Sequence, residues 1–113
     1  MRFALVSKNE SRAALLLGVN AEAPAAVVFS CAGVKILPEE RDLFQMANPL
    51  GFILFARNID TPDQVRKLVS ELRASVERPN TIIMIDQEGG RVQRLRPPHW
   101  STYPAMQKLG KKA

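Results

Sequence analysis

The segment Asp86-Gln87-Glu88-Gly89-Gly90-Arg91-Val92-Gln93-Arg94 holds the residue types in this chain that could do chemistry. It directly follows the apolar run Thr81–Ile85, which predicts a strand buried on both faces. Parallel α/β folds bind ligands at the carboxyl ends of their strands. The carboxylates of Asp86 and Glu88, followed by a bend that glycine permits and by arginine donors, therefore predict a site for a polar small molecule.

Asp86 and Glu88 allow three interpretations. Residues two apart on a strand face the same way, and retaining glycosidases use two carboxyl groups about 5 Å apart, so the two could form a catalytic pair. Alternatively, Asp86 accepts hydrogen bonds from sugar hydroxyls, while Glu88 pairs with Arg91 or Arg57 and fixes the loop. The third interpretation is a turn with a purely structural role. The residues alone leave all three open.

Three apolar runs predict the strands that would position this segment. Ala25–Ser30, Gly51–Ala56 and Thr81–Ile85 are rich in apolar residues, many of them β-branched or aromatic. Helical patterns separate the runs, so the order βαβαβ predicts an α/β fold with a parallel sheet and right-handed crossovers. A polar, proline-interrupted loop is expected over Arg91–Tyr103, and the segment Tyr103–Met106 is expected to begin another helix.

The first helix is expected from Glu39 to Ala47, with Pro38 in its first turn and acidic residues at its positive end. Leu43, Met46 and Ala47 would form its apolar stripe.

The second helix is expected to start at Pro62, where Thr61 can cap it and Gln64 completes a capping box. Apolar residues at helical spacing predict its buried face, which comprises Val65, Leu68, Val69, Leu72 and Val76.

Composition restricts the classes of function. The 113 residues are 46% hydrophobic and 24% charged, as in a globular domain. The net charge is +5, but the basic residues are spread out and aromatic residues are few, which argues against a nucleic-acid partner. No apolar run approaches the 18 or so residues of a membrane span. The lone cysteine, Cys31, is expected to be a small buried hydrophobe in a reducing compartment.

Residues 1–23 are expected to be an added leader, either a short helix or disordered. Ala13–Val19 and Ala21-Glu22-Ala23 weakly resemble a secretory signal and its cleavage site, but Glu10 and Pro24 oppose that interpretation.

The segment Asp86–Arg94, together with Leu50-Gly51-Phe52-Ile53-Leu54-Phe55-Ala56-Arg57-Asn58, resembles the start of bacterial β-N-acetylhexosaminidases of glycoside hydrolase family three. These enzymes trim N-acetylglucosamine from cell-wall fragments. The resemblance covers roughly Ala26 to Gly110. It implies that residues 24–113 are the N-terminal βαβαβ portion of a TIM (β/α)8 barrel of about 250 residues, and so an incomplete one. Such a portion would leave an open sheet edge and uncovered apolar faces.

The resemblance also implies roles for particular residues. In the family, the aspartate that opens the motif and the arginine that ends it bind the non-reducing sugar, and these match Asp86 and Arg94. Arg57 and Asn58 end the second strand and should face the same end of the barrel. Together with Glu88 and Arg91 they are candidates for supporting the sugar-binding residues, although Arg57 and Asn58 would equally suit a strand cap.

The family's catalytic groups lie in other segments. The nucleophile is an aspartate near the end of a late strand, the acid/base is a histidine on a mobile loop, and a Lys-His-Phe-Pro-Gly-His segment helps to hold the sugar. None of these segments is found in the 113 residues, and His99, beside Trp100, has the wrong context for the acid/base. The resemblance therefore implies no catalytic residue here, and the sequence itself has neither metal-ligand spacing nor the pattern Gly-x-Gly-x-x-Gly of a phosphate loop.

The expected function is that of a cytoplasmic, retaining hydrolase of N-acetylglucosamine-containing muropeptide fragments, for which this chain supplies part of the sugar-binding site. One alternative is a truncated, non-catalytic gene remnant or a fragment that binds sugar or a partner. Another is an unrelated small α/β protein that uses Asp86 and Glu88 directly. A Lys-His-Phe-Pro-Gly-His segment downstream of Ala113 would establish the enzyme.

Overall fold

The computed structural model describes residues 23–111, so the expected leader lies, apart from Ala23, outside the described residues. The elements follow one another in a regular alternation of strands and helices. In chain order they are β1 (Ala25–Phe29), α2 (Pro38–Ala47), β2 (Pro49–Leu54), the 3-10 turn η1 (Ala56–Asn58), α3 (Pro62–Ser75), β3 (Ile82–Ile85), β4 (Gln87–Gly89), β5 (Val92–Gln93) and α4 (Met106–Gly110).

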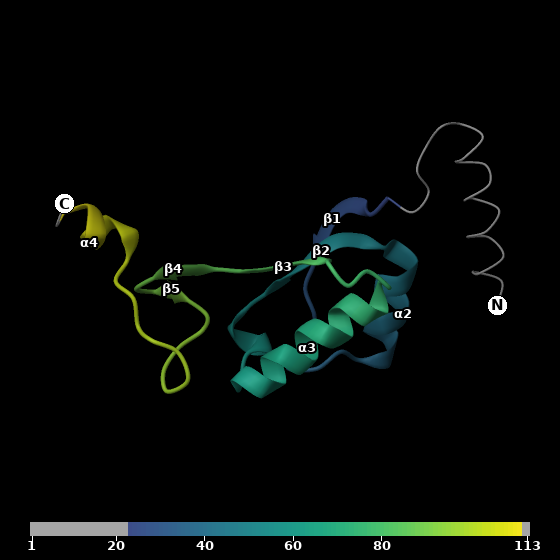
Figure 1. Ribbon diagram of the computed structural model, residues 1–113, viewed down its shortest axis with the longest axis horizontal. Coiled ribbons are helices and arrows are strands. Elements are labelled where there is room, and N and C mark those ends of the chain that lie inside the picture. The colour runs from purple at the N-terminus through teal and green to yellow at the C-terminus, as the bar shows by residue number, and fades with distance from the viewer. Residues whose placement is uncertain (1–22, 112–113) are drawn as a thin grey trace.

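The main sheet has the strand order β1-β2-β3, and both pairs are parallel. The register of β2 on β3 runs from Gly51 opposite Ile82 to Leu54 opposite Ile85. The predicted α/β fold with a βαβαβ order and a parallel sheet is therefore confirmed. Strands β4 and β5 form a separate antiparallel hairpin, which extends with α4 away from the sheet (Figure 1).

Helix α3 follows its predicted pattern. Thr61 is the N-cap, and its hydroxyl accepts from the backbone N–H of Gln64 at 3.2 Å. The expected reciprocal half of the capping box is shifted by one residue, because Gln64 Oε1 accepts from the backbone N–H of Asp60 at 2.8 Å. The predicted apolar face is confirmed, with the leucines and Val76 buried and the other two valines packed against them.

Helix α2 contradicts the expected apolar stripe. Phe44 is 1% exposed, whereas Leu43 and Met46 are 45% and 64% exposed. The cause is aromatic packing, because the ring of Phe44 meets Phe52 edge-on at 4.9 Å and stacks with Phe29 at 6.1 Å. The predicted acid at the helix start is confirmed in Glu40, whose carboxylate accepts from two backbone N–H groups at 2.7 and 2.9 Å.

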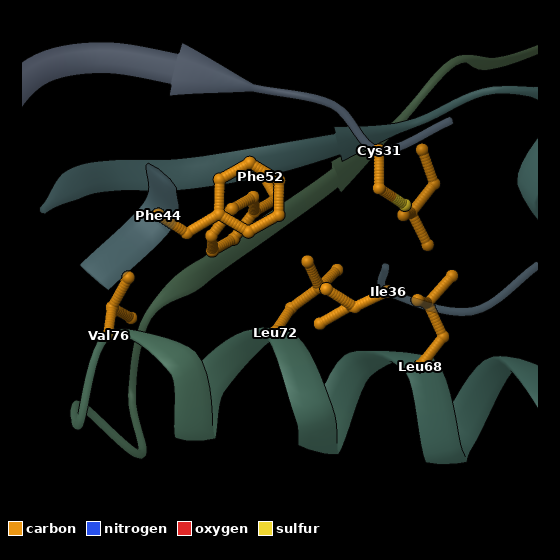
Figure 2. Close-up of a cluster of buried hydrophobic side chains, with 8 residues drawn as sticks. Cys31, Ile36, Phe44, Phe52, Leu68, Leu72 and Val76 are labelled. Atoms are coloured by element: carbon orange, nitrogen blue, oxygen red, sulfur yellow. The ribbon is translucent and has the colours of Figure 1, made fainter. Parts of the chain in front are cut away.

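The core lies between the sheet and the two helices (Figure 2). Phe52 and Leu54 of β2 point into it and meet Phe44 of α2 and the leucines of α3. The buried hydrophobic residues are Cys31, Ile36, Phe44, Phe52, Leu54, Leu68, Leu72 and Val76. Both helices thus cover one face of the sheet.

The opposite face of the sheet is open, so the prediction that β3 is buried on both faces is wrong. Ile83 and Ile85 pack against the core, but Ile82 is 48% exposed and Met84 is 38% exposed. Val28 of β1, which is paired with Gly51 and so lies on the same face as Ile82, is likewise exposed. Strand β3 has β2 on one side and forms an edge of the described sheet.

The element ends differ from expectation by one to three residues. β1 ends at Phe29 rather than Ser30, and β2 spans Pro49–Leu54, because the chain turns into η1 where continued strand was expected. β3 begins at Ile82, since the hydroxyl of Thr81 donates to the carbonyl of Arg78 at 2.8 Å. α4 begins at Met106 rather than near Tyr103. Every helix within residues 23–111 is too short or too polar to cross a lipid bilayer.

We expect the purified chain to self-associate, because an unpaired strand edge and an apolar sheet face both favour burial against another molecule. Sedimentation velocity over a concentration series should show this. Met84→Lys, on the open face, should weaken self-association about tenfold or more, since a charge there opposes burial. Met46→Lys, on the exposed surface of α2, is the matched control and should leave it unchanged. A sharp, concentration-independent thermal transition from a verified monomer would contradict this expectation.

Candidate functional site

Polar groups gather at the carboxyl ends of the three parallel strands, among them the predicted site residues Asp86, Arg57 and Asn58. Ser30 and Cys31 follow β1, Phe55 to Asn58 follow β2, and Asp86 follows β3. Because the strands are parallel, these segments lie together at the carboxyl end of the sheet, where α/β folds place their ligands.

Asp86 and Arg94 form an ion pair, with 3.4 Å between Oδ2 and Nη2. The hairpin β4–β5 reverses the chain and returns Arg94 to the end of β3. Arg94 also donates its backbone N–H to the carbonyl of Asp86 at 3.3 Å. Both side chains are partly exposed, 37% for Asp86 and 26% for Arg94, so the pair is open to a ligand. The two residues assigned to sugar binding by resemblance therefore lie together.

The predicted glycine bend is confirmed within the hairpin. Gly89 and Gly90 have φ values of +83° and +60°, the left-handed region that favours glycine. A Cβ on Gly89 would also collide with the backbone carbonyl of Pro104. The backbone N–H of Gly90 donates to the carbonyl of Tyr103 at 2.8 Å. The two glycines therefore let residues 103–105 pack against the hairpin.

Glu88 lies in β4 and Arg91 in the turn of the hairpin, and both are exposed. The ion pairs among residues 23–111 are Asp86–Arg94 and Asp63–Arg66, so the expected pairing of Glu88 with Arg91 or Arg57 does not form. The carbonyl of Arg91 accepts from the guanidinium of Arg96 at 3.2 Å. A role for Glu88 or Arg91 at a bound sugar stays a prediction.

Arg57 is fixed by the segment that follows β1. Its Nε donates to the carbonyl of Cys31 at 3.1 Å, and its Nη2 donates to the hydroxyl of Ser30 at 2.9 Å. Its guanidinium carbon lies 4.9 Å from the centre of the Phe55 ring, and that of Arg94 lies 5.9 Å from the same centre. The structure thus brings Arg57 and the Asp86–Arg94 pair together around one aromatic ring.

Asn58 is fully buried and binds backbone groups on both sides of the site. Its Oδ1 accepts from the N–H of Phe55 at 2.8 Å, and its Nδ2 donates to the carbonyls of Cys31 and Gly33 at 2.9 and 2.8 Å. These bonds make Asn58 a tie between the loop after β1 and the end of β2. Asn58 can thus influence Arg57 or Asp86 only by holding the backbone of these two segments in place.

Two glutamines organise the loop, and the sequence prediction missed them. Gln87 Oε1 accepts from the backbone N–H groups of Arg94 and Leu95 at 3.1 and 3.0 Å. Gln93 is 2% exposed; its Nε2 donates to the carbonyls of Leu95 and Ser101, and its Oε1 accepts from the N–H of Tyr103. In the sequence, Gln87 and Gln93 each stand beside a charged residue on either side of the glycine bend. Such alternation predicts a hairpin whose two faces carry different side chains.

Cys31 and His99 take no part in the pair. Cys31 is 2% exposed, which confirms the expected buried hydrophobe, and burial, aided by the charge of Glu40, raises the pKa of its thiol. His99 is exposed beside Trp100, with the two ring centres 5.7 Å apart. Within the part of the chain that the structure describes, no three His, Cys, Asp or Glu side chains converge on a possible metal site.

An open groove of about 620 Å³ lies on the surface of α3, lined by Arg66, Val69, Arg73, Arg78 and their neighbours. It reaches the loop that precedes β3, at the amino end of that strand, whereas Asp86 is at the carboxyl end. Arg73 and Arg78 donate there to the carbonyls of Thr81 and Pro49 and tie the starts of β3 and β2. The groove is therefore separate from the candidate site.

No protein-family model matches the chain. Curated relatives do match it, and their name is beta-hexosaminidase. One from Pseudomonas aeruginosa is 42% identical over 71 residues, which are 63% of this chain and 21% of the relative. One from Stenotrophomonas maltophilia is 39% identical over 84 residues, which are 74% of this chain and 24% of the relative. The chain thus spans about a fifth to a quarter of the length of the curated relatives it matches.

Solved structures match the fold as well. NagZ from Neisseria gonorrhoeae, in complex with N-trifluoroacetyl-D-glucosamine, superimposes with a TM-score of 0.70 at 33% identity over 78% of this chain and 25% of that protein. A glycoside hydrolase family 3 β-N-acetylglucosaminidase from Paenibacillus superimposes with a TM-score of 0.65 at 32% identity over 74% of this chain and 16% of that protein. Sequence and fold thus agree on the same group of proteins.

We expect Asn58→Ala to lower the free energy of unfolding by roughly 2–5 kcal/mol, because the Phe55 N–H and the Gly33 carbonyl lose the amide that pairs them, while the Cys31 carbonyl keeps Arg57. Denaturant unfolding at a fixed protein concentration measures the change. Asn80→Ala removes an exposed asparagine side chain and is the matched control, with an expected change within about 0.5 kcal/mol. Equal unfolding midpoints for the two variants would show that Asn58 does not tie the two segments.

Proposed function

We propose that this chain, which corresponds to the N-terminal part of the bacterial β-N-acetylhexosaminidases of glycoside hydrolase family three, supplies part of the sugar-binding site of such an enzyme. The enzyme would release terminal β-linked N-acetylglucosamine from cell-wall fragments in the cytoplasm, with retention and without a cofactor. The observation that carries the proposal is the pairing of Asp86 with Arg94 at the carboxyl end of β3. Relatives over this stretch share both the sequence and the fold.

The Asp86–Arg94 pair suits a sugar with neighbouring hydroxyls. A carboxylate only accepts hydrogen bonds and a guanidinium only donates them, whereas a hydroxyl does both. Arg94 uses Nη2 on Asp86, and its Nε is buried without a hydrogen-bond partner. A sugar held at this pair would donate to Asp86 and could accept from Arg94. Binding of this kind orients a substrate, but breaking the glycosidic bond requires further groups.

The barrel architecture is the second part of the proposal. Parallel strands that alternate with helices on one face, and an opposite face of exposed valine, isoleucine and methionine, fit the inner wall of a TIM barrel whose other strands complete the interior. The nucleophile and the acid/base would come from those other strands and their loops.

A non-catalytic role is the rival proposal, in which the same pair binds sugar or a partner without turnover. The exposed Glu88 bears on a third proposal, direct catalysis by Asp86 and Glu88. A retaining pair needs both carboxyl groups about 5 Å apart on either side of one bond, and the hairpin gives Glu88 no described partner that would fix it there. The first proposal is therefore the best supported.

We expect the purified 113-residue chain to release no measurable chromophore from a chromogenic β-N-acetylglucosaminide. Holding the sugar leaves most of the bond-breaking barrier in place when nucleophile and acid/base are absent. Turnover that survives purification and disappears in Asp86→Ala or Glu88→Ala would contradict the proposed roles and favour direct catalysis.

The role of Asp86 can be tested in a completed enzyme, made by joining residues 24–110 to the remaining barrel of the Neisseria gonorrhoeae relative. Asp86→Ala should lower kcat/KM by about one to three orders of magnitude, because charged hydrogen bonds of about 1.5–3 kcal/mol each are lost. Arg94→Ala should have a milder effect in the same direction. The pH–rate profile should keep both limbs in each variant.

Asp63→Ala is the matched control, since it removes the acid of the other, highly exposed ion pair and should leave kcat/KM unchanged. If Asp86→Ala removes one limb of the pH–rate profile, Asp86 transfers a proton or attacks the sugar, and its assignment to binding is wrong.

A further inference from the structure

Phe55 lies against Arg57 and Arg94, among the polar residues at the carboxyl ends of the strands, although its own side chain is apolar. It is the first residue after β2, and its backbone N–H is held by the buried amide of Asn58 at 2.8 Å. The guanidinium carbons of Arg57 and Arg94 lie 4.9 and 5.9 Å from its ring centre, within the range of a cation–π contact. One ring therefore contacts two arginines that come from different strand ends.

The two arginines depend on this ring to different degrees. Arg57 has two further acceptors, the carbonyl of Cys31 and the hydroxyl of Ser30. The Arg94 side chain has a single hydrogen bond among the described residues, the 3.4 Å contact with Asp86, and its Nε is buried without a partner. Among residues 23–111 the Asp86 carboxylate is thus the hydrogen-bond partner of the Arg94 side chain and the Phe55 ring is its cation–π partner, whereas Arg57 has two further hydrogen bonds.

The ordinary alternative is that Phe55 is one more core residue. Phe55 is half-buried, and it is absent both from the buried cluster and from the partly buried side chains that pack against that cluster within the described chain. Phe29 is also half-buried, but it packs against the core and stacks with Phe44. The Phe55 ring instead lies against the two arginines, which points to a role at the carboxyl ends of the strands.

We propose that Phe55 is a positioning residue that holds the guanidinium of Arg94 against Asp86, so that a sugar meets an already assembled acceptor and donor. The inference rests on the proposed function, because it assigns Phe55 to the same sugar-binding pair. It predicts a loss of substrate affinity rather than of chemistry when the ring is removed, since Phe55 acts through Arg94.

The kinetic test uses the completed enzyme described above. Phe55→Leu should raise KM about three- to tenfold, as expected for one lost cation–π contact, and should change kcat less than about twofold. Phe55→Tyr keeps the aromatic face and should restore KM to within about twofold of the parent value. Phe29→Leu, the matched control for loss of a half-buried ring, should leave KM unchanged.

A double substitution separates positioning from an independent effect. If Phe55 acts through Arg94, Phe55→Leu combined with Arg94→Ala should be no worse than Arg94→Ala alone. Losses that multiply, or a Phe55→Tyr variant as impaired as Phe55→Leu, would overturn the inference. Normal kcat/KM in Asp86→Ala would instead overturn the proposed function.

A second measurement decides the positioning without turnover. The ¹⁵N relaxation of the Arg94 Nε–H group in the same protein should report greater mobility in Phe55→Leu than in the parent and in Phe29→Leu. The Nε–H of Arg57 should stay unchanged, because its other acceptors remain. An Arg94 side chain equally ordered in Phe55→Leu would overturn the inference, whether or not the enzyme is active. Thermal midpoints of the two leucine variants control for a general loss of stability.

Discussion

The buried amide of Asn58 is the interaction on which the polar edge of this sheet depends. A single side chain, with no exposure to solvent, satisfies backbone groups of Phe55, Cys31 and Gly33. The bonds to Cys31 and Gly33 cross 27 and 25 residues of sequence. Buried backbone groups must be paired, so this amide fixes the path of two strand ends at once. Arg57 and Phe55 take their positions from those paths.

The hairpin after β3 adds the third strand end by a different means. Glutamine side chains pin its loop, and left-handed glycines let residues 103–105 lie against it. The result places Arg94 beside Asp86 and close to the ring that also contacts Arg57. Polar amides thus build a site whose charged groups stay partly exposed, while the apolar core lies under the helices on one face of the sheet.

Much of the fold could be predicted from the sequence, because α3 has a long apolar period with a capping residue and proline at its start. Helix α2 has ten residues, and over so short a span periodicity does not decide which of two neighbours, Leu43 or Phe44, is buried. Ring packing with Phe52 buries Phe44.

The burial of β3 was overestimated because an apolar run predicts a strand but does not show whether a second layer covers its other face. Asp86 and Arg57 lie at the same end of the sheet as expected, since parallel strands share their carboxyl end, and the glycine hairpin returns Arg94 to Asp86. Gln87, Gln93 and Phe55 escaped notice because their roles arise from the hairpin turn and from contacts between strand ends.

The Asp86–Arg94 pair closes over only eight residues, with a glycine turn between them. Contacts this local cost little loop-closure entropy, and hairpins of this size form within about 1–10 μs. The hydrogen bonds of Asn58, in contrast, require β1 and β2, which are farther apart in the sequence, to come together. Asp86 and Arg94 can therefore meet as soon as their own hairpin closes, whereas the direction in which the pair faces is set by the pairing of strands β1 to β3.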